Sequence, residues 1–417
     1  MKKLTIILLW IFSLISAQVG PAEELHRNPP RAWALTNATI HASPGKTIVN
    51  GTVVMRDGMI TSVGSDVKIP KQATIRDMEG KHIYAGFIES WLDVNTIKKD
   101  TSLQAHWNSN MRAYLKAADL FHPKDKELRD LRALGFTTAH ITPKGGIFQG
   151  QSALVQLGKT PKVLSENIAQ VIEFASSGWG SREYPTSLLG VIAFIRQGFY
   201  DATWYEKTGN ILSKYPDGNE PIQKDRSLEA LSSGKGEKQP FVFRTNNELY
   251  IDRSENIADE FDLNFWIRGN GYEYRRIDQM PASFMIVPLN FPGKPDVADP
   301  YQALQYTTEQ LKHWDMAPDN LAKLVAAGFQ VALTGSDLKN KKDFQKNLSR
   351  SINRGLNESD ALAALTTNPA REFGQSKRLG KVAPGYIANL VITDDNYFSG
   401  ESTVNAVWID GNEYEIE

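Results

Sequence analysis

The sequence predicts an α/β protein: a (β/α)8 TIM-like barrel with a small composite β-sandwich domain built from both chain ends. Short strand-like runs alternate with amphipathic helical stretches in the middle of the chain, which favours a parallel sheet. Strand-rich segments of similar texture flank this region on both sides. The chain has 417 residues, enough for one large domain and a smaller one.

The composition is typical of a soluble globular protein, with 41% hydrophobic and 23% charged residues. The 47 basic and 48 acidic residues give a net charge of −1, which argues against nucleic acid or an anionic membrane as a partner. Because the chain contains no cysteine, disulfides and thiolate metal sites are excluded.

The chain begins MKKLTIILLWIFSLISAQ, in which two lysines precede an apolar run and then small residues. This layout predicts a signal peptide over residues 1–17, cleaved after Ala17. The alternative is a membrane anchor, but the run is short for a span of roughly 20 residues. Export without cysteines favours a periplasmic or secreted protein with no stable membrane insertion after the signal is removed.

Residues 18–84 are predicted to form the N-terminal part of the β-sandwich. Strand-like runs at 33–40, 51–56 and 59–63 fit this assignment, and Asp57-Gly58 is a strong hairpin-turn signal between the last two.

Residues 85–378 are predicted to form the barrel. A helix over 318–327 begins with a proline, which suits the first helical position. The polar, glycine-containing stretch 207–239 indicates a surface loop or a helical insertion. The predicted strands of the barrel lie at 136–141, 240–243, 264–267, 283–287 and 329–333.

Residues 379–417 return to strands and are predicted to complete the sandwich. Runs at 389–393 and 404–409 are followed by a second hairpin signal, Asp410-Gly411, and a final strand at 413–417.

A series of short motifs in this order resembles the amidohydrolase superfamily, and most of all its imidazolonepropionase-like branch of secreted bacterial proteins. The resemblance covers nearly everything after the signal peptide. The motifs are LTNATI (35–40), DGMITSVG (57–64), GFI (86–88), LGFTT (134–138), ALTGSD (332–337), ALAALTTNPA (361–370) and LGKVAPGYIANLV (379–391).

The resemblance implies hydrolysis, mostly of C–N bonds, by zinc or another divalent metal that lowers the pKa of a bound water. It also implies metal ligands at the carboxyl ends of the barrel strands. In the family pattern, strand 1 supplies His-x-His, strands 5 and 6 supply one histidine each, and strand 8 supplies an aspartate. Many members add a lysine or glutamate near strand 4, a position that the sequence alone does not assign here.

Four of the five mapped ligand positions hold other residues. In AGFIESWLD (85–93), Trp91 and Asp93 replace the two histidines of strand 1. Arg244 takes the position on strand 5, and Gly269, give or take a residue, takes that on strand 6. An indole N–H only donates, and a guanidinium has no free lone pair and would repel a cation.

Asp337 keeps the family residue on strand 8 and is the candidate catalytic residue. His140 is the one histidine predicted to approach the mouth of the barrel, and a hydrogen-bonded structural role is favoured for it. Arg244 and Asp93 are candidate binding residues. Arg244 is expected to neutralise Asp93 or Asp337, or else to bind an anionic ligand. We therefore expect no metal and no other cofactor.

The favoured function is an exported, degenerate amidohydrolase-like module that is not catalytic by itself. It would be one half of a tandem protein or would support a partner, either a second amidohydrolase module or another copy in a homo-oligomer. One alternative is an active hydrolase of peptides or cyclic amides with an atypical site around Asp337, in which Asp93 and His140 assist. The other is a periplasmic module that binds a peptide or glycan through Arg244.

Overall fold

The computed structural model of this chain describes residues 32–95, 105–176, 183–218, 220–236, 239–280 and 283–416. The predicted signal peptide, residues 1–17, lies outside these ranges. Among the described helices, none combines the length and the apolar character that a membrane span requires.

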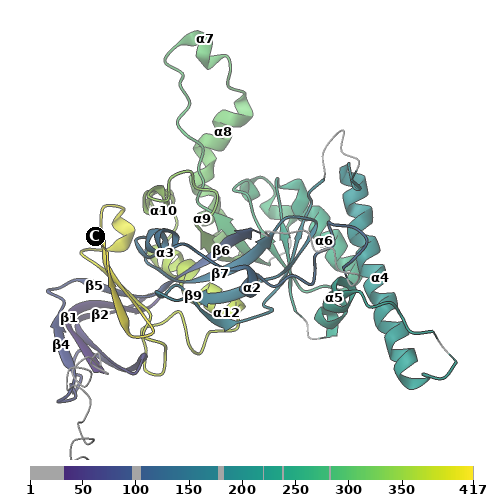
Figure 1. Cartoon of the computed structure of the whole chain (residues 1–417). Coiled ribbons are helices and arrows are strands. Elements are labelled where there is room, and N and C mark those ends of the chain that lie inside the picture. Colours follow the sequence, from purple (N-terminus) through teal and green to yellow (C-terminus); the bar gives the residue numbers. More distant parts are fainter. Residues whose placement is uncertain are drawn as a thin grey trace, which may run out of the picture.

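One sheet of eight strands combines the two ends of the chain (Figure 1). Its strands are β1 (Ala32–Ser43), β2 (Lys46–Arg56), β3 (Met59–Gly64), β4 (Thr74–Asp77), β5 (His82–Ala85), β16 (Leu390–Thr393), β17 (Val404–Ile409) and β18 (Asn412–Glu415). They follow the order β18-β17-β16-β5-β1-β2-β3, with β4 beside β1. The N-terminal and C-terminal parts meet where β5 pairs antiparallel with β16.

Both predicted hairpin turns are confirmed in this sheet. Asp57 and Gly58 have φ angles of 48° and 78° between β2 and β3, and Asp410 and Gly411 have φ angles of 53° and 75° between β17 and β18. Positive φ at both central residues suits the right-handed twist of the flanking strands. The predicted β-sandwich is nevertheless one hydrogen-bonded sheet, because β5 pairs with β1 on one side and with β16 on the other.

The middle of the chain forms two further sheets. One has four strands in the order β10-β9-β7-β6, and the other has six in the order β15-β14-β13-β12-β11-β8. Their bounds are β6 (Phe87–Asn95), β7 (Phe136–Lys144), β8 (Phe148–Gln151), β9 (Ala153–Gln156), β10 (Lys162–Ser165), β11 (Gln170–Glu173), β12 (Phe241–Arg244), β13 (Phe265–Arg268), β14 (Phe284–Pro288) and β15 (Gln330–Thr334). All five strands predicted for this region overlap observed strands, and β11 to β15 are parallel.

The mixed α/β class is confirmed, but among the described residues the strands do not form one closed hydrogen-bonded ring. Strand β9 pairs antiparallel with β7, and β8 pairs antiparallel with β11. The sequence predicted parallel strands throughout this region, and these two antiparallel pairs depart from that order.

Most of the helices lie around these sheets, whereas α7 and α8 lie on a projecting segment (Figure 1). The helices are α2 (Ala117–Leu120), α3 (Asp125–Arg132), α4 (Leu188–Lys214), α5 (Arg226–Gly236), α6 (Leu249–Phe261), α7 (Pro300–Ala303), α8 (Thr308–Met316), α9 (Asn320–Ala326), α10 (Asp343–Asn353), α11 (Glu358–Leu365) and α12 (Thr367–Glu372). Four 3-10 helices are η1 (Glu273–Arg275), η2 (Ile277–Gln279), η3 (Ala317–Asp319) and η4 (Tyr397–Ser399). The helix predicted over 318–327 is therefore η3 followed by α9.

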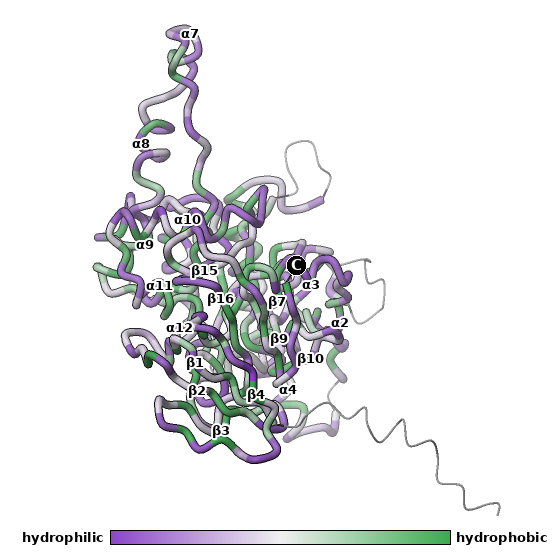
Figure 2. Tube along the Cα trace, turned by 90° about the vertical axis from the view of Figure 1, so that its left-hand side faces the viewer, coloured by the Kyte–Doolittle hydropathy of each residue, from purple (hydrophilic) through white to green (hydrophobic). Residues whose placement is uncertain are grey.

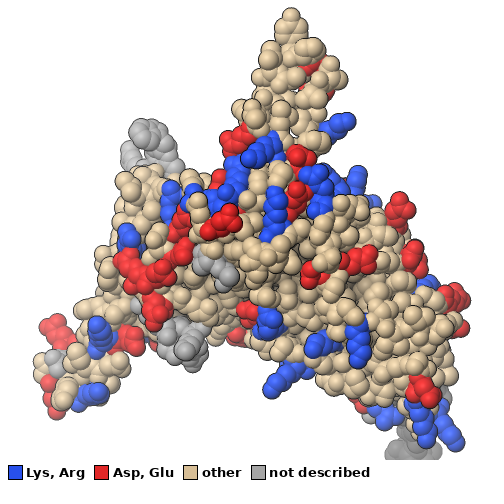
Figure 3. All heavy atoms as spheres, turned by 180° about the vertical axis from the view of Figure 1, so that it is seen from behind, with Lys and Arg blue, Asp and Glu red and all other residues tan. Residues whose placement is uncertain are grey.

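Buried apolar strands form the interior. Strand β7 is buried at every residue except its last, and β16 is buried throughout, which Figure 2 shows as hydrophobic segments within the molecule. The segment that carries α7 and α8 projects away from the rest (Figures 1 and 2). Acidic and basic side chains are intermixed on the face seen in Figure 3, in keeping with the small net charge.

Side chains join the four-stranded and six-stranded sheets where β6 lies beside β15. Glu89 of β6, which is 1% exposed, accepts hydrogen bonds from the backbone N–H of Trp91 (3.1 Å) and of Gly335 (2.9 Å). The hydroxyl of Thr334 donates to the carbonyl of Trp91 at 3.0 Å. We call this set of contacts the β6–β15 seam.

Glu89→Ala is expected to lower the free energy of unfolding by about 2–4 kcal/mol, because two buried N–H groups lose their acceptor. Glu89→Gln keeps one acceptor oxygen and is expected to cost less. Urea unfolding followed by circular dichroism measures both. The exposed Glu206 provides the control, since Glu206→Ala is expected to change stability by less than about 0.5 kcal/mol. Equal costs at Glu89 and Glu206 would contradict the role of the seam.

Candidate functional site

Three charged side chains lie at one level at the carboxyl ends of neighbouring parallel strands. Glu173 ends β11, Arg244 ends β12 and Arg268 ends β13. The strand register pairs Glu173 with Arg244, and Arg244 with Arg268. Because each residue follows an apolar run that is buried in the sheet, the sequence itself brings these charges to the same edge.

Asp93 of β6 binds three donors at this edge. Arg244 Nη1 lies 3.1 Å from Asp93 Oδ1 and 3.2 Å from Oδ2. Lys144 Nζ lies 3.1 Å from Oδ2, and the indole N–H of Trp91 donates to Oδ1 at 2.8 Å. Burial by itself would raise the pKa of Asp93, but the charges of Arg244 and Lys144 and the bond from Trp91 bring that pKa below its ordinary value. Asp93 is therefore held ionised and fully engaged.

Arg268 forms a second ion pair, with Asp337. Its Nη2 lies 2.5 Å from Asp337 Oδ2 and 2.7 Å from the hydroxyl of Ser336, and its Nη1 donates to the carbonyl of Gly269 at 2.6 Å. The Arg268 side chain is 3% exposed, against 36% for that of Asp337. A buried guanidinium needs such acceptors, because a buried charge without a partner is costly.

Trp91 lies between the two ion pairs and is fully buried. The guanidinium carbons of Arg244 and Arg268 are each 5.9 Å from the centroid of a Trp91 ring, within the range of cation–π attraction. The indole thus contacts both arginines while its N–H binds Asp93. Trp91, Asp93, Arg244, Arg268 and Asp337 are called the charged site below.

The structure brings most of the predicted site residues together, in different pairs from some of those expected. Arg244 pairs with Asp93, as one alternative predicted, while Asp337 pairs with Arg268. Gly269 is not the residue in register with Arg244; Arg268 is. A Cβ atom at Gly269 would lie 2.3 Å from Glu273 Oε1, so the backbone there has no room for a side chain.

Sequence reasoning missed three residues of this edge: Glu173, Lys144 and Arg268. Glu173 occupies the end of β11, the strand 4 position that the sequence did not assign. It accepts a hydrogen bond from Gln149 Nε2 at 2.6 Å, and Arg244 Nε lies 3.9 Å from it. An acidic residue directly after the buried run Gln170–Ile172 was the available signal.

His140 lies in the core and not at the strand ends. Its Nδ1 is 2.9 Å from the carbonyl of Ser90, and its ring stacks on Phe373 with the centroids 4.3 Å apart. Burial lowers the pKa of His140 to about 4. The imidazole is therefore neutral near pH 7, and the carbonyl of Ser90 makes Nδ1 the protonated nitrogen.

The residues of the charged site do not fit the metal that the family would place there. Histidine is absent from all the mapped positions, and the carboxylates of Asp93 and Asp337 are both bound to guanidinium groups. Across the part of the chain that the structure describes, no three histidine or acidic side chains converge on a point suited to a metal ion.

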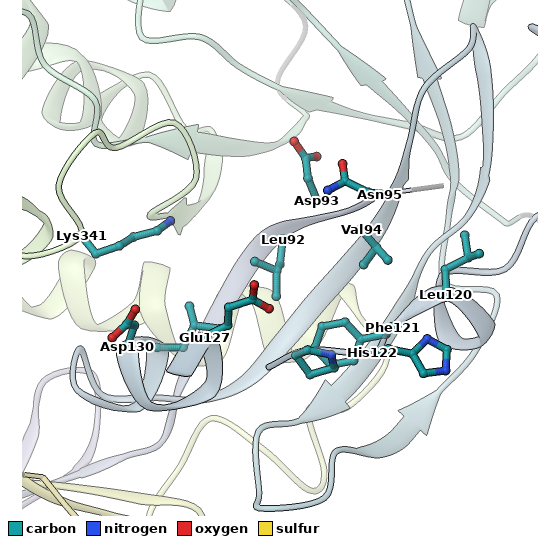
Figure 4. A pocket seen from close by; sticks show the side chains of 12 residues that line it. Leu92, Asp93, Val94, Asn95, Leu120, Phe121, His122, Glu127, Asp130 and Lys341 are labelled. Carbon is teal, nitrogen blue, oxygen red and sulfur yellow. The ribbon is translucent and has the colours of Figure 1, made fainter. Parts of the chain in front are cut away.

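A cavity of about 440 Å³ lies beside the charged site (Figure 4). Figure 4 shows that Asp93 and Asn95 point away from Leu92 and Val94, as alternation along β6 requires. Strand β6 thus separates the mainly apolar part of the cavity from the ion pairs. The residues that line the cavity are Leu92, Asp93, Val94, Asn95, Leu120, Phe121, His122, Pro123, Glu127, Asp130, Leu131 and Lys341.

Comparison with known sequences supports the family resemblance. The profile of the amidohydrolase family matches residues 319–414. Amidohydrolase tasK of Hapsidospora irregularis is 22% identical over 402 residues. This relative and the profile agree with the predicted resemblance to the amidohydrolase superfamily. The match covers 87% of this chain but only 39% of the length of that relative.

Solved structures show the same fold. An amidohydrolase from Thermotoga maritima MSB8 has a TM-score of 0.74 and 22% identity, and the match covers 92% of this chain and 100% of the other. A prolidase complexed with N-methylphosphonate-L-proline has a TM-score of 0.55 and 15% identity, over 93% of this chain and 100% of the other.

The buried His140 gives the protein a pH-dependent stability. The unfolded chain takes up a proton at this side chain below pH 6.5, whereas the folded chain does so only near pH 4. Stability is therefore lost as the pH falls through this window. Between pH 7 and pH 5 the free energy of unfolding is expected to fall by about 2 kcal/mol on account of His140.

This contribution is measured by urea unfolding of the wild type and of His140→Phe at the two pH values. The variant is expected to lose about 2 kcal/mol less between pH 7 and pH 5. Phe373→Leu is the control, because it removes the stacking partner and keeps the titrating group. Identical pH dependence in the wild type and in His140→Phe would show that His140 does not titrate in this way.

The Arg268–Asp337 pair is expected to stabilise the fold, and the cost of changing either residue is expected to depend on whether the other is present. Asp337→Asn leaves a buried guanidinium without its anion and is expected to cost about 1–3 kcal/mol, since Asp337 is partly exposed. Adding Arg268→Met removes the unpaired charge, and the double variant is expected to cost less than the sum of the two single changes.

A double-mutant cycle measured by urea unfolding provides the coupling energy, expected at about 1–2 kcal/mol. The Arg354–Asp315 pair, whose side chains are 42% and 58% exposed, serves as the matched control. Its coupling is expected below about 1 kcal/mol. Equal coupling in the two cycles would contradict a special role for the buried pair.

Proposed function

We propose that this protein is an exported amidohydrolase-like module that lacks the hydrolytic metal site and is not catalytic by itself. It supports a partner, either a second amidohydrolase module or another copy of the chain. The observation that carries this proposal is the pair of guanidinium groups, Arg244 and Arg268, at strand ends where the family pattern has histidines.

The physical argument rests on lone pairs and charge. A divalent cation would meet two permanent positive charges here, with Lys144 as a third, and would have to displace them from Asp93 and Asp337. The indole of Trp91 offers it no lone pair. The ion pairs already neutralise the carboxylates that a metal would otherwise hold, so the site is stable without one.

The length of the curated relative supports a tandem arrangement. The chain matches 39% of Amidohydrolase tasK, which leaves room in that protein for a second unit of similar size. In such a pair, a module without ligands could pack against one that retains them.

The proposal includes the architecture that the module presents to its partner. The four-stranded and six-stranded sheets would be two parts of one TIM-like barrel, brought together at the β6–β15 seam. Residues 85–378 form the barrel in this proposal, and residues 18–84 and 379–417 form the composite β domain. Removal of residues 1–17 would release the module into the periplasm or the medium.

The two alternatives from the sequence have less support. In a hydrolase centred on Asp337, the carboxylate would have to act through Oδ1, because Oδ2 is bound to Arg268. Recognition of a peptide or glycan carboxylate by Arg244 would require Arg244 to leave Asp93, where it contacts both oxygens.

Metal loading followed by elemental analysis tests the proposal. After incubation with excess zinc or manganese and gel filtration, the purified chain is expected to retain far less than one ion per molecule. The quadruple variant Trp91→His, Asp93→His, Arg244→His and Arg268→His, once shown to be folded, provides the comparison, because it restores imidazole at the mapped positions. It is expected to retain more zinc than the wild type.

A stoichiometric ion on the wild-type chain would overturn the proposal. So would hydrolysis of dipeptides or cyclic amides by the wild type that Asp337→Asn abolishes, which would support the alternative centred on Asp337. These measurements do not depend on the oligomeric state.

A further inference from the structure

Helix α4 presents an exposed apolar stripe along its whole length. At 100° per residue, the members of the stripe fall within about 80° of one another around the helix axis. The large members are exposed by 81% at Leu189, 56% at Tyr200, 56% at Trp204, 56% at Ile211 and 67% at Tyr215, which ends the helix. The small residue Ala193 lies on the same face and is also exposed. These six residues are called the α4 stripe.

A different face of α4 already packs on the protein. Its buried residues are Val191, Phe194, Ile195, Gly198, Phe199 and Ala202. The helix is thus apolar on two faces, and a solvent-exposed helix normally needs only one. Figure 1 shows α4 at the edge of the molecule opposite the eight-stranded sheet, with its C-terminal half extending outward. A stripe with four large exposed side chains in its central and C-terminal turns indicates an interaction surface.

The positions of the α4 stripe are symmetric about residue 202. Leu189 and Tyr215 lie at equal distances from that residue, as do Ala193 and Ile211, and Tyr200 and Trp204. Consider two copies of α4 that cross antiparallel about a two-fold axis at the level of residue 202. Each residue of a pair on one helix then faces the other residue of that pair on the second helix. The stripe is therefore complementary to itself.

The polar residues on this face are also compatible with the two-fold arrangement. The two-fold arrangement places Lys207 opposite Gln197, and Arg196 opposite Thr208, so that no like charges face each other. Arg196 is in addition paired with Glu260 at 2.6 Å, and Glu260 also accepts a hydrogen bond from the hydroxyl of Tyr200 at 3.1 Å. These contacts hold the side chains of Arg196 and Tyr200 in place before two copies associate.

From these observations we infer that the protein forms a two-fold symmetric dimer through the α4 stripe, with the two α4 helices antiparallel. A two-fold interface uses the same surface on both copies, which this symmetry satisfies. Small Ala193 receives branched Ile211, and Tyr200 stacks beside Trp204 of the other copy. This inference concerns a surface that shares no residue with the charged site, and it holds whether or not that site binds a metal.

The size of the stripe suits a specific dimer. Six aromatic side chains, three from each copy, would together bury on the order of 600 Å². Leucine, isoleucine, alanine and the flanking polar stems on both copies bring the total to roughly 1,000 Å², the lower bound for a specific interface. A dimer of moderate affinity is expected, and its dissociation constant should respond strongly to the central aromatic pair.

Sedimentation velocity over a range of concentrations tests this inference. The purified chain is expected to be a dimer at the upper concentrations, and Trp204→Glu is expected to raise the dissociation constant about 100-fold or more, because each dimer contains this residue twice. Tyr301→Glu is the matched control, since Tyr301 is 82% exposed but lies in α7, away from the stripe. It is expected to leave the dissociation constant unchanged.

Crosslinking tests the register, because the chain contains no cysteine of its own. With a short bis-maleimide, a mixture of Ala193→Cys and Ile211→Cys chains is expected to crosslink, whereas either variant alone is not. A monomeric wild type at all concentrations, a dimer that Trp204→Glu does not weaken, or crosslinking of Ala193→Cys alone would overturn the inference.

Discussion

The buried carboxylate of Glu89 is the contact on which the arrangement of the charged site depends. It accepts backbone N–H groups from its own strand and from Gly335, and so sets β6 against the end of β15. Burial raises the pKa of Glu89 above its ordinary value, and the hydrogen bonds from Thr334, Gly335 and Trp91 together with the charge of Lys341 oppose part of that rise. Trp91 lies two residues beyond Glu89, and Asp337 lies two residues beyond Gly335. The contact between Glu89 and Gly335 therefore brings the residues of β6 and those that follow β15 into one site.

The charged site is an edge of parallel strands at which arginine side chains pair with carboxylates of the same chain. The family uses carboxylates and imidazoles to hold a metal. Here guanidinium groups stand beside the remaining carboxylates, and the indole of Trp91 fills the space between them. Each ionised group is partnered, which avoids the cost of an isolated buried charge. The likeness to solved amidohydrolases therefore concerns the fold, and the chemistry of this edge is a property of the chain itself.

The charged site and the α4 stripe lie on different elements of the molecule. The charged site belongs to the strand ends, where polar groups pair within the chain. Helix α4 lies at the outer edge and leaves aromatic rings in contact with solvent (Figure 1). A module that uses its helices for association and keeps its strand ends satisfied internally fits the supporting role proposed for it.

The sequence by itself indicated the resemblance to the amidohydrolase superfamily, the positions of many of the strands, both Asp-Gly hairpins and the identity of most residues at the charged site. These features follow from local patterns: an apolar run fixes a strand, and a polar residue directly after it lies at the strand end. Only the tertiary structure decided which charges pair, that Arg268 and not Gly269 is in register with Arg244, and that Glu173 completes the edge. Pairing depends on strand register and on the approach of residues that are 151 positions apart (Asp93 and Arg244) or 69 positions apart (Arg268 and Asp337). A one-residue difference in register changes which side chain faces the site. The same reason explains why the composite domain is one sheet, since the neighbours of β5 are chosen by contacts between opposite ends of the chain.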